Sequence, residues 1–558
     1  MTDRERWVLR RRYDEGFQLS VPWLDPILAR ILYARHIDSP ASIHQYLAPP
    51  EAPSSDPLML PDMPLAVERI EAALAADEQI VVYGDFDADG MCATALLVSA
   101  LRRRGARVKA YIPDRFDEGY GLNAAAVESI YAEGTRLLIT VDCGIRSYTE
   151  VALARAIGLE VIITDHHSVP DALPPANAVV DPKRPDSRYP FSELSGTGVA
   201  YALAQTLLGS AAEEYLDLVA VATVADIVPL CDENRALVRV GLERLRHQPR
   251  PGLAALMQAA GVVAEQARSS DVAFRLAPRL NAAGRLANAR LGYDLLASET
   301  IDEARPLAAE LDALNQKRQE LLEQQCHQAR QLLAPQPDDL CLFVAAEGLH
   351  QGLVGLIASR LCEEHYRPAF VMTASDGAYT GSARSIEGFH VTRALEGCAD
   401  LLLRFGGHEA AAGFTLPVDN YDVFASRLLA QAADALSDQD LVPSRRVDAI
   451  VSLGELSVQT PLALDALGPF GEGHPEPLLA SRGVVIREVR RMGRDGRHLR
   501  LRVSSDNGSI KCVGWGMGAL GEQYAAGQCV DLLYSPEVDT YNGNASLQLS
   551  LVSMRPAQ

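Results

Sequence analysis

Short apolar segments that alternate with amphipathic stretches constrain the fold of this chain more than any other feature. They begin near residue 79 and read EQIVVYGD, RVKAYIPD, RLLITVDCG, LEVIITDHH and NAVVDPK, with the helical MCATALLVSALRRRG after the first. Strands that are apolar without alternation are buried on both faces, and helices between such strands place them parallel in one sheet. The pattern therefore predicts a doubly wound parallel sheet for residues 61–230.

The rest of the 558 residues separates into regions with other patterns, and a chain of this length fits about three or four domains. Residues 231–335 are mainly helical and end in a long polar helix over 304–334, which we expect to connect two domains. A second α/β pattern follows over 336–442. Short strands with glycine and Asn-Gly turns fill 443–558, which suits a small barrel such as an OB-fold, and residues 1–60 form a separate N-terminal segment.

The composition excludes several classes of protein. Apolar residues make up 48% and charged residues 22%, as in ordinary globular proteins, and the formal charge of −21 gives no global basic field for nucleic acid. The nine cysteines are scattered and never spaced as CxxC, which favours reduced thiols over disulfides or a zinc ribbon. No run of about 18 apolar residues occurs, and MTDRERWVLRRRYDEG at the N-terminus lacks an apolar stretch, so we expect a cytoplasmic protein without a membrane span.

Acidic and imidazole side chains follow the predicted strands at the point where each strand ends. They are Asp85, Asp87 and Asp89 after IVVYG, Asp142 after LLITV, and Asp165, His166 and His167 after VIIT. The carboxyl ends of parallel strands meet at one edge of the sheet, where open α/β sheets bind their ligands. Asp226 lies in the apolar stretch VATVADIVPL, where a charge is costly unless it is paired or bound to metal. We therefore expect these groups to converge on one site.

The clustered carboxylates predict a metal site, because their joint ionisation requires divalent cations between them. Oxygen ligands with one imidazole and no thiolate suit Mn²⁺ or Mg²⁺ better than structural zinc, and the imidazole favours Mn²⁺. The alternative is that each aspartate caps the helix after its strand, which is common for a single residue such as Asp89 but accounts poorly for four clusters at one edge. Of two adjacent histidines, one can bind metal while the other donates to a phosphate oxygen, although a lone histidine is more often structural.

Arginines in glycine- or proline-containing motifs are candidates for binding phosphate, because the planar guanidinium binds two oxygens at once. The candidates are Arg115, Arg279 and Arg285, together with Arg384 and its neighbour Ser382 in GSARS. We predict that these segments are loops that face a cleft. The alternative for each arginine is a surface salt bridge, which we expect for most other arginines of the chain. The segment GGH at 406–408 also fits a tight turn before a helix.

The last region reverses the acidic balance of the chain, because residues 482–502 hold eight arginines against two acids. A basic barrel face with aromatic side chains binds single strands without sequence preference, by neutralising phosphates and stacking on bases. The aromatic residues nearby include Trp515, Tyr534 and Tyr541. We expect the contacts to come from Arg490, Arg491, Arg494, Arg497 and Trp515. The alternative is a solvated strand face with the aromatic residues in the core.

Nine motifs in order give the chain a resemblance to a known superfamily. GDFDADG (84–90), VDCG (141–144), TDHH (164–167) and TVADIVPL (223–230) resemble the four motifs of the DHH phosphoesterases. The resemblance narrows to the bacterial 5′ to 3′ exonucleases specific for single-stranded DNA through IPDRFDEGYGL (112–122), APRLNAAGRL (277–286), ELDALNQKRQE (310–320), GSARSIEGFH (381–390) and FGGHEAAAGF (405–414). It extends from about residue 60 to the end, and implies a DHH catalytic domain, a DHHA1-type α/β domain and an OB-fold-like barrel.

The resemblance also implies roles for individual residues. The metal ligands would be Asp87, Asp89, Asp142, His166 and Asp226, with Asp142 shared by two metals and Asp85 at the rim of the same site. His167 would orient a ligand or stabilise the transition state, and Tyr83 stands where many superfamily members have a metal-binding histidine. The 5′ end or nearby phosphates would be held by Arg115, Arg285, Ser382 and Arg384, and the further DNA-binding candidates are Arg279, Asn281, His350 and His408.

The function implied by the resemblance is metal-dependent release of mononucleotides from the 5′ end of single-stranded DNA, in repair and recombination. Two cations, Mn²⁺ or Mg²⁺, would activate water and stabilise the leaving 3′ oxygen. Single-strand-binding protein and a helicase would be partners of a monomeric enzyme. Two alternatives remain. A DHH phosphatase or short-oligonucleotide nuclease would not need the basic barrel, and a non-catalytic DNA-binding scaffold would have lost acidic ligands.

Overall fold

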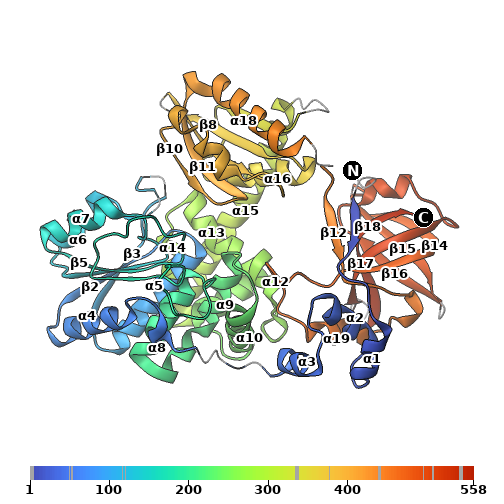
Figure 1. Ribbon diagram of the computed structural model, residues 1–558, viewed down its shortest axis with the longest axis horizontal. Helices are drawn as coiled ribbons and strands as arrows, with labels where there is room; N and C mark the ends of the chain where they lie inside the picture. The colour runs from blue at the N-terminus through green and yellow to red at the C-terminus, as the bar shows by residue number, and fades with distance from the viewer. Residues whose placement is uncertain are drawn as a thin grey trace. The chain divides into compact units, whose positions relative to one another are not determined.

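The computed structural model in Figure 1 describes residues 5–557 except 50, 52–54, 116, 120, 334–338, 376, 438–440, 494, 506–507 and 540–544. The chain divides into two compact units, and each is described by itself. The smaller unit consists of Met1–Pro50, Val442–Phe470 and His474–Gln558, and the larger of Glu51–Leu441 with Gly471–Gly473. Among the described residues, no helix combines the length and the apolar character that crossing a membrane would require.

The larger unit begins with a parallel sheet whose strands are in the order β3-β2-β4-β5-β6. These strands are β2 (Gln79–Tyr83), β3 (Arg107–Tyr111), β4 (Leu137–Val141), β5 (Glu160–Thr164) and β6 (Ala178–Val180). One face is covered by α4 (Met63–Ala75), α5 (Ala88–Arg103) and α8 (Gly196–Leu208), and the other by α6 (Ala124–Ala132) and α7 (Tyr148–Ile157) (Figure 1). The predicted doubly wound parallel sheet is confirmed.

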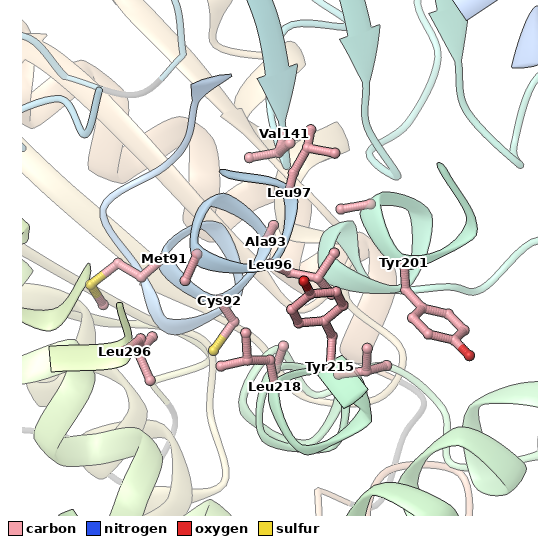
Figure 2. Packing of buried hydrophobic residues seen from close by; sticks show 14 of the residues in the cluster. Met91, Cys92, Ala93, Leu96, Leu97, Val141, Tyr201, Tyr215, Leu218 and Leu296 are labelled. Atoms are coloured by element: carbon pink, nitrogen blue, oxygen red, sulfur yellow. The ribbon is translucent and has the colours of Figure 1, made fainter. Parts of the chain in front are cut away.

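Helix α5 is buried along most of its length, because β4 and several helices surround it. Figure 2 shows Met91 of α5 beside Leu296, Cys92 directed toward Leu218, and other side chains of the same helix beside Val141 at the end of β4. Burial on all sides explains why the segment reads as continuously apolar and small, without a polar face. The packing also fixes the position of the helix start, where Asp87 and Asp89 lie.

A helical region follows the parallel sheet, as predicted. Its helices are α9 (Leu216–Ala225), α10 (Asp232–His247), α11 (Pro251–Ala260), α12 (Ser269–Asp271), α13 (Ala277–Leu286), α14 (Arg290–Leu296) and α15 (Ile301–Leu332). Helix α15 is the long helix that the sequence indicates. Its N-cap Thr300 accepts a hydrogen bond from the amide of Glu303, and its buried residues pack first on the core beside the parallel sheet and then on the next domain. It therefore connects the two α/β domains.

The second α/β domain has a mixed sheet in the order β10-β11-β9-β8-β7. Its elements are β7 (Leu342–Ala346), α16 (Val354–His365), β8 (Ala369–Ser375), β9 (Ala378–Arg384), α17 (Val391–Glu396), β10 (Arg404–Gly407), β11 (Ala411–Pro417) and α18 (Tyr421–Leu436). Helix α16 covers one face together with α15, while α17 and α18 cover the other. The second α/β domain expected from the sequence is therefore present.

One local prediction in this domain is wrong. The segment GSARS is not a loop but the end of strand β9. The alternative for GGH, a tight turn before a helix, does not apply, because GGH precedes the turn of the β10–β11 hairpin. Gly381 in GSARS reflects packing, because a Cβ there would lie 2.3 Å from the ring of Phe414 on the neighbouring strand. A glycine that makes room for an aromatic ring has the same sequence signal as a glycine in a loop.

The smaller unit contains the predicted barrel. It is formed by β14 (Leu479–Met492), β15 (His498–Ser505), β16 (Gly508–Gly514), β17 (Cys529–Asp539) and β18 (Ser546–Pro556), and it closes because β14 pairs with both β15 and β17. Strand β13 (Ala449–Ile450) and helix α19 (Gln459–Asp465) flank it. The pairing of β17 with β18 confirms the predicted hairpin, while its turn at 540–544 lies outside the described residues.

The N-terminal residues share the core of this barrel. Helices α1 (Glu15–Ser20), α2 (Pro26–Ala34) and α3 (Pro40–Leu47) bury their apolar residues in the same cluster as the barrel strands, and β1 (Arg6–Leu9) pairs with β12 (Ser444–Val447). Asp448, which is 2% exposed, forms ion pairs with Arg35 Nε at 2.8 Å and Arg10 Nε at 3.1 Å. The first fifty residues and the barrel are therefore one folded unit.

Candidate active site

The acidic residues meet at the carboxyl edge of the parallel sheet, as predicted. Strand β4 pairs in parallel with β2 and β5, so the residues after these strands lie side by side. Asp142 directly follows β4 with a φ of 61°, a conformation that non-glycine residues rarely adopt and that is often found at functional sites. Its side chain lies against Gly196, where a Cβ would be 2.5 Å from Asp142 Oδ1. The close approach of α8 thus requires glycine at this position.

His166 faces three of the carboxylates. Its Nε2 atom lies 3.1 Å from Asp142 Oδ1, 3.6 Å from Asp226 Oδ2 and 3.9 Å from Asp89 Oδ2. Neither ring nitrogen has a hydrogen-bond partner among the described residues, although the side chain is buried. Burial, followed by repulsion from His167, lowers the pKa of His166 to about 4, so the ring is neutral at pH 7. A neutral imidazole that directs a nitrogen at carboxylates has the arrangement of a metal ligand.

The carboxylates themselves lie too close together to be charged without a cation. One group of ligand atoms comes from Asp85, Asp87 and Asp142, and another from Asp89, His166 and Asp226, with the atoms of each group within 4.8 Å of one another. Burial, and then repulsion between neighbouring aspartates, raises the pKa of Asp85, Asp142 and Asp226 well above the usual range. The buried Oδ1 of Asp85 has no hydrogen-bond partner among the described residues. Carboxylate oxygens with one imidazole fit Mn²⁺ or Mg²⁺.

Asp87 and Asp89 are oriented by the starts of two helices. Asp87 is the N-cap of α5 and accepts hydrogen bonds from the amides of Asp89 and Gly90 through Oδ1. Asp89 accepts from the amides of Gly196 and Thr197 at the start of α8, at 2.7 and 2.8 Å. The sequence suggested capping for Asp89, but the capping residue is Asp87. Capping and metal binding are compatible, because each carboxylate has further lone pairs.

Asp165 and His167 form a hydrogen-bonded pair beside the metal ligands. Asp165 is fully buried, and its Oδ1 accepts from His167 Nδ1 at 2.7 Å. Although burial opposes ionisation, this bond and the charge of His167 bring the pKa of Asp165 to about 2. Burial likewise opposes charge on His167, but the Asp165 carboxylate raises its pKa above 6.5. A cationic His167 donates through Nδ1 to Asp165 and has a second donor at Nε2.

His408, from the second α/β domain, lies near His167. It follows β10, and its ring lies 6.4 Å from the ring of His167 at an interplanar angle of 18°. Burial, and then the charge of His167, lowers the pKa of His408. The GGH segment therefore adds a neutral imidazole to the site from a different domain of the larger unit.

Three arginines form a cationic cluster, which consists of Arg115, Arg285 and Arg384. Burial, and then repulsion from Arg115, Arg318 and Arg384, lowers the pKa of Arg285 to about 9. The aspartates Asp85 and Asp87 act on Arg115, so the cationic cluster adjoins the metal ligands. Arg384 Nη1 donates to Ser382 Oγ at 2.8 Å, and a Cβ at Gly355, in the first turn of α16, would lie 3.0 Å from Arg384 Nη2. Desolvated arginines of this kind are suited to bind an anion.

The predicted loops for these arginines are mostly wrong. Arg279 and Arg285 lie on α13, and Ser382 and Arg384 lie on β9. Gly284, which suggested a loop, allows α13 to approach the turn after β2, because a Cβ there would lie 2.4 Å from the carbonyl oxygen of Phe86. Arg115 follows β3 in a turn, with its guanidinium carbon 4.9 Å from the centroid of the Phe86 ring.

The other predicted DNA-binding residues have structural partners. Arg279 forms an ion pair with Asp312 at 2.8 Å, which is the alternative that the sequence left open. Asn281 Oδ1 accepts from the amide of Ala88 at 2.8 Å and so positions the start of α5. His350 Nδ1 accepts from the amide of Gly352, and burial followed by Lys317 and Arg115 lowers its pKa. Contact of Arg279, Asn281 and His350 with DNA stays a prediction.

Tyr83 has no part in the metal site. It is fully buried, its hydroxyl donates to the carbonyl of Gly121, and its ring stacks on Tyr111 with centroids 4.9 Å apart. The metal-binding histidine that many superfamily members have at this position is therefore replaced by a core residue. Asp85, two residues later, has a buried Oδ1 without a hydrogen-bond partner among the described residues.

The outer face of the barrel is basic near β14 and β15. Arg490 pairs in register with Arg500, and Met492 with His498. Trp515, just after β16, is 62% exposed, and its ring lies 5.0 Å from His498. Trp515 is therefore accessible, and its contact with DNA stays a prediction.

Some barrel residues do not fit the predicted face. Tyr534 is fully buried and its hydroxyl bonds with Ser481, so it belongs to the core and cannot stack on a base. Arg491 forms an ion pair with Glu522, while Arg497 is exposed. Arg494 and Tyr541 lie outside the described residues.

Comparison with known proteins matches the same three regions. The family model for the DHH family, N-terminal domain, matches residues 79–223, the DHHA1 domain matches 339–434, and the RecJ OB domain matches 447–553. The parallel sheet with its acidic edge and the attached α/β domain together define a protein of the DHH class.

Similar proteins narrow this class to one family. The chain is 38% identical to single-stranded-DNA-specific exonuclease RecJ of Bacillus subtilis, over 99% of this chain and 71% of that protein. It is 35% identical to the RecJ of Salmonella typhimurium, over 99% of each. The crystal structure of RecJ in complex with Mn²⁺ from Thermus thermophilus matches with a TM-score of 0.85 and 32% identity, over 100% of this chain and 80% of that one. The chain therefore belongs to the RecJ family.

Proposed function

We propose that this protein is a metal-dependent exonuclease that degrades single-stranded DNA from its 5′ end to mononucleotides, in DNA repair and recombination. The observation that carries the proposal is that Arg115, whose guanidinium carbon lies 4.9 Å from the ring centroid of Phe86 between Asp85 and Asp87 in the chain, feels the charges of both carboxylates and of the arginines of the cationic cluster. A terminal phosphate held by these arginines places the adjoining phosphodiester near the metal ligands. The end of the strand that carries this phosphate is then the end that is cut.

The metals would be held by the acidic edge of the sheet, through Asp87, Asp89, Asp142, His166 and Asp226, with Asp85 as a further ligand. When bound, two divalent cations supply an activated water and stabilise the leaving oxygen. The chain contributes fixed ligand positions, because helix starts hold Asp87 and Asp89 before any ligand arrives. Preorganisation of this kind reduces the reorganisation that the reaction requires.

The imidazoles of His167 and His408 act on the substrate phosphate in this proposal. Asp165 raises the pKa of His167 and fixes the direction of its ring, so that in the protonated form Nε2 can donate to a non-bridging oxygen that gains charge in the transition state. His408 approaches from the other α/β domain. The phosphate is then contacted from both domains, which restricts the direction in which a strand can lie.

The basic face of the barrel provides a second binding surface for the DNA strand. The exposed Arg490 and Arg497 would neutralise backbone phosphates, and Trp515 would stack on a base. We further propose that the protein works in the cytoplasm as a monomer, with single-strand-binding protein and a helicase as partners. The family resemblance supports these last assignments.

The test uses 3′-labelled single strands with either a 5′-phosphate or a 5′-hydroxyl, digested in Mn²⁺, with duplex DNA of the same sequence as the comparison. We expect a ladder that shortens from the 5′ end of single strands only. Arg384→Met should raise the KM for the 5′-phosphorylated strand by about 10- to 100-fold, because hydrogen bonds to charged groups contribute about 1.5–3 kcal/mol. The 5′-hydroxyl strand should be affected much less.

Arg427→Met is the matched control, because Arg427 lies in the same domain and forms a surface ion pair with Asp400. It should leave both KM values unchanged. Products that shorten from the 3′ end would contradict the proposed polarity. An equal loss on both substrates in Arg384→Met would show that Arg384 has only a structural role.

A further inference from the structure

Asn234, in the first turn of α10, is a fully buried residue to which the proposed function gives no role. Its side-chain Nδ2 donates to two backbone carbonyls, that of Glu193 at 2.6 Å and that of Pro229 at 3.1 Å. Only the NH₂ end of an asparagine can serve two acceptors in this way, so the contacts fix the orientation of the amide. Asn234 therefore ties the segment before α8 to the segment after α9.

Both of the tied segments support metal ligands. Glu193 stands just before the start of α8, whose first amides hold the carboxylate of Asp89. Pro229 stands three residues after Asp226. Ligand atoms of Asp89 and Asp226 belong to one group with His166, within 4.8 Å of one another. Asn234 thus links the supports of two carboxylates that would hold the same metal.

A second bond joins the same two segments on the other side of Asp226. The hydroxyl of Thr223, three residues before Asp226, lies 3.3 Å from the hydroxyl of Ser195, which is the N-cap of α8. Thr223 and Ser195 are both fully buried. Asp226 is therefore held between two ties, one three residues before it and the other three residues after it.

The backbone directly after Asp226 requires a restraint of this kind. Ile227 has a φ of 60°, a conformation that β-branched residues rarely adopt. Its side chain is 68% exposed, so its own packing does little to hold the backbone there. A strained conformation persists only when the surrounding structure fixes it. The bond from Asn234 to the carbonyl of Pro229 supplies such a restraint two residues later.

The stability of the fold alone does not account for an asparagine at this position. Asn234 Oδ1 is buried and has no hydrogen-bond partner among the described residues. A buried acceptor without a partner is unfavourable, and an apolar side chain of similar size would avoid that cost. An apolar side chain would, however, leave the carbonyls of Glu193 and Pro229 free to separate.

We propose that Asn234 is a positioning residue that sets the separation of Asp89 and Asp226, and with it the affinity for the metal that they share with His166. This inference rests on the proposed function, which supplies the metal. The hydrogen bonds of Asn234 reach only backbone carbonyls of the supporting segments, so its effect on the metal is indirect. Changes to groups that orient metal ligands typically lower metal affinity by about 10- to 100-fold.

The experiment measures binding of Mn²⁺ to the full-length protein without DNA, from the electron paramagnetic resonance signal of free Mn²⁺. Asp226→Asn identifies which of the two binding constants belongs to the site of Asp226. Asn234→Leu should weaken this site by about 10- to 100-fold and leave the other site within about threefold of wild type. Asn234→Ser, which keeps one hydroxyl donor, should weaken the same site less.

Asn420→Leu is the matched control, because Asn420 Nδ2 also donates to a backbone carbonyl, that of Leu401, in the second α/β domain. It should leave both binding constants unchanged. In the nuclease assay, the Mn²⁺ concentration for half the maximal rate should rise for Asn234→Leu along with the Kd. The KM for single strands at saturating Mn²⁺ should stay the same.

Thermal unfolding without metal separates positioning from stability. The Tm should fall for Asn234→Leu and for Asn420→Leu, because buried carbonyls lose their donor in each, but only the first should lose Mn²⁺ affinity. Unchanged binding constants in a folded Asn234 variant, an equal loss at both sites, or failure of both Asn234 variants to unfold cooperatively would overturn the inference and leave the proposed function intact. Failure of the wild-type protein to bind two Mn²⁺ ions would instead reject the proposed metal chemistry, and the inference with it.

Discussion

Asp165→Asn tests how far the buried carboxylate beside the metal ligands supports the reaction. Asp165 Oδ1 accepts from His167 Nδ1 and from the amides of His166 and His167, while Oδ2 accepts from the amide of Ile145 at 2.9 Å. An asparagine has the same shape but only one acceptor oxygen. Its oxygen will occupy the Oδ1 position, because the reverse orientation loses three hydrogen bonds and the chosen one loses only the bond from Ile145.

The magnitude of the effect follows from these contacts. One buried amide without an acceptor costs about 1–3 kcal/mol, which for a large domain lowers the Tm by about 2 to 10 °C. Loss of the carboxylate charge also removes the main reason why the pKa of His167 lies above 6.5, so the imidazolium is lost at a lower pH. Changes to groups that orient histidines at metal sites reduce activity by about 10- to 100-fold, and we expect a fall of this size in kcat/KM.

The assay follows release of nucleotides from a 5′-phosphorylated single strand in saturating Mn²⁺, together with calorimetric unfolding and an NMR titration of His167 without metal. Asp186→Asn is the control, since Asp186 forms an ion pair with Arg184 and its side chain is 64% exposed. A kcat/KM within twofold of wild type, with the titration of His167 unchanged, would refute the role of Asp165.

Two further predictions concern the smaller unit. A protein limited to residues 51–441 should fold and digest short oligonucleotides. A protein of residues 1–441 should aggregate, because Ile27, Ile31 and Ile43 lose the barrel core against which they pack. Light scattering of the two proteins checks this, and a soluble, monomeric 1–441 would contradict it. Trp515→Ala should weaken binding of long single strands by about 1–3 kcal/mol, or about 5- to 150-fold, without changing the salt dependence of binding, because stacking involves no phosphate. Fluorescence anisotropy at several salt concentrations measures the affinity and its salt dependence. A changed slope of log Kd against log salt concentration would argue against stacking.

The parallel sheet could be predicted because its signal is local. Strands β2, β4 and β5 are buried on both faces, so their sequences are apolar throughout and the acids after them are conspicuous. The union of the first fifty residues with the barrel could not be predicted. Amphipathic helices indicate that one face is buried but not against what, and Arg35 and Asp448 are 413 positions apart in the chain.

The metal ligands could be inferred for the same reason, while the groups that orient them could not. Gly196 and Thr197 donate hydrogen bonds to Asp89 through their backbone amides. Every residue type except proline has such an amide, so the sequence does not identify these donors. The arginines were located by residue type, but glycines next to them suggested loops where close packing of α13 and β9 is the actual cause.

The two charged clusters of the site are each unfavourable when alone, and this couples their ligands. Carboxylates at the edge of the sheet have raised pKa values, while burial and mutual repulsion lower those of Arg285 and Arg384. Asp85 and Asp87 attract Arg115, which reduces its availability for a phosphate. Under the proposed function, divalent cations at the acidic edge would neutralise that attraction and leave Arg115 to the substrate, and a bound phosphate would in turn remove the positive field that opposes the cations. By thermodynamic linkage each ligand would then increase the affinity for the other. A chain of net charge −21 could in this way bind a polyanion at its active site, in addition to the basic face of the barrel.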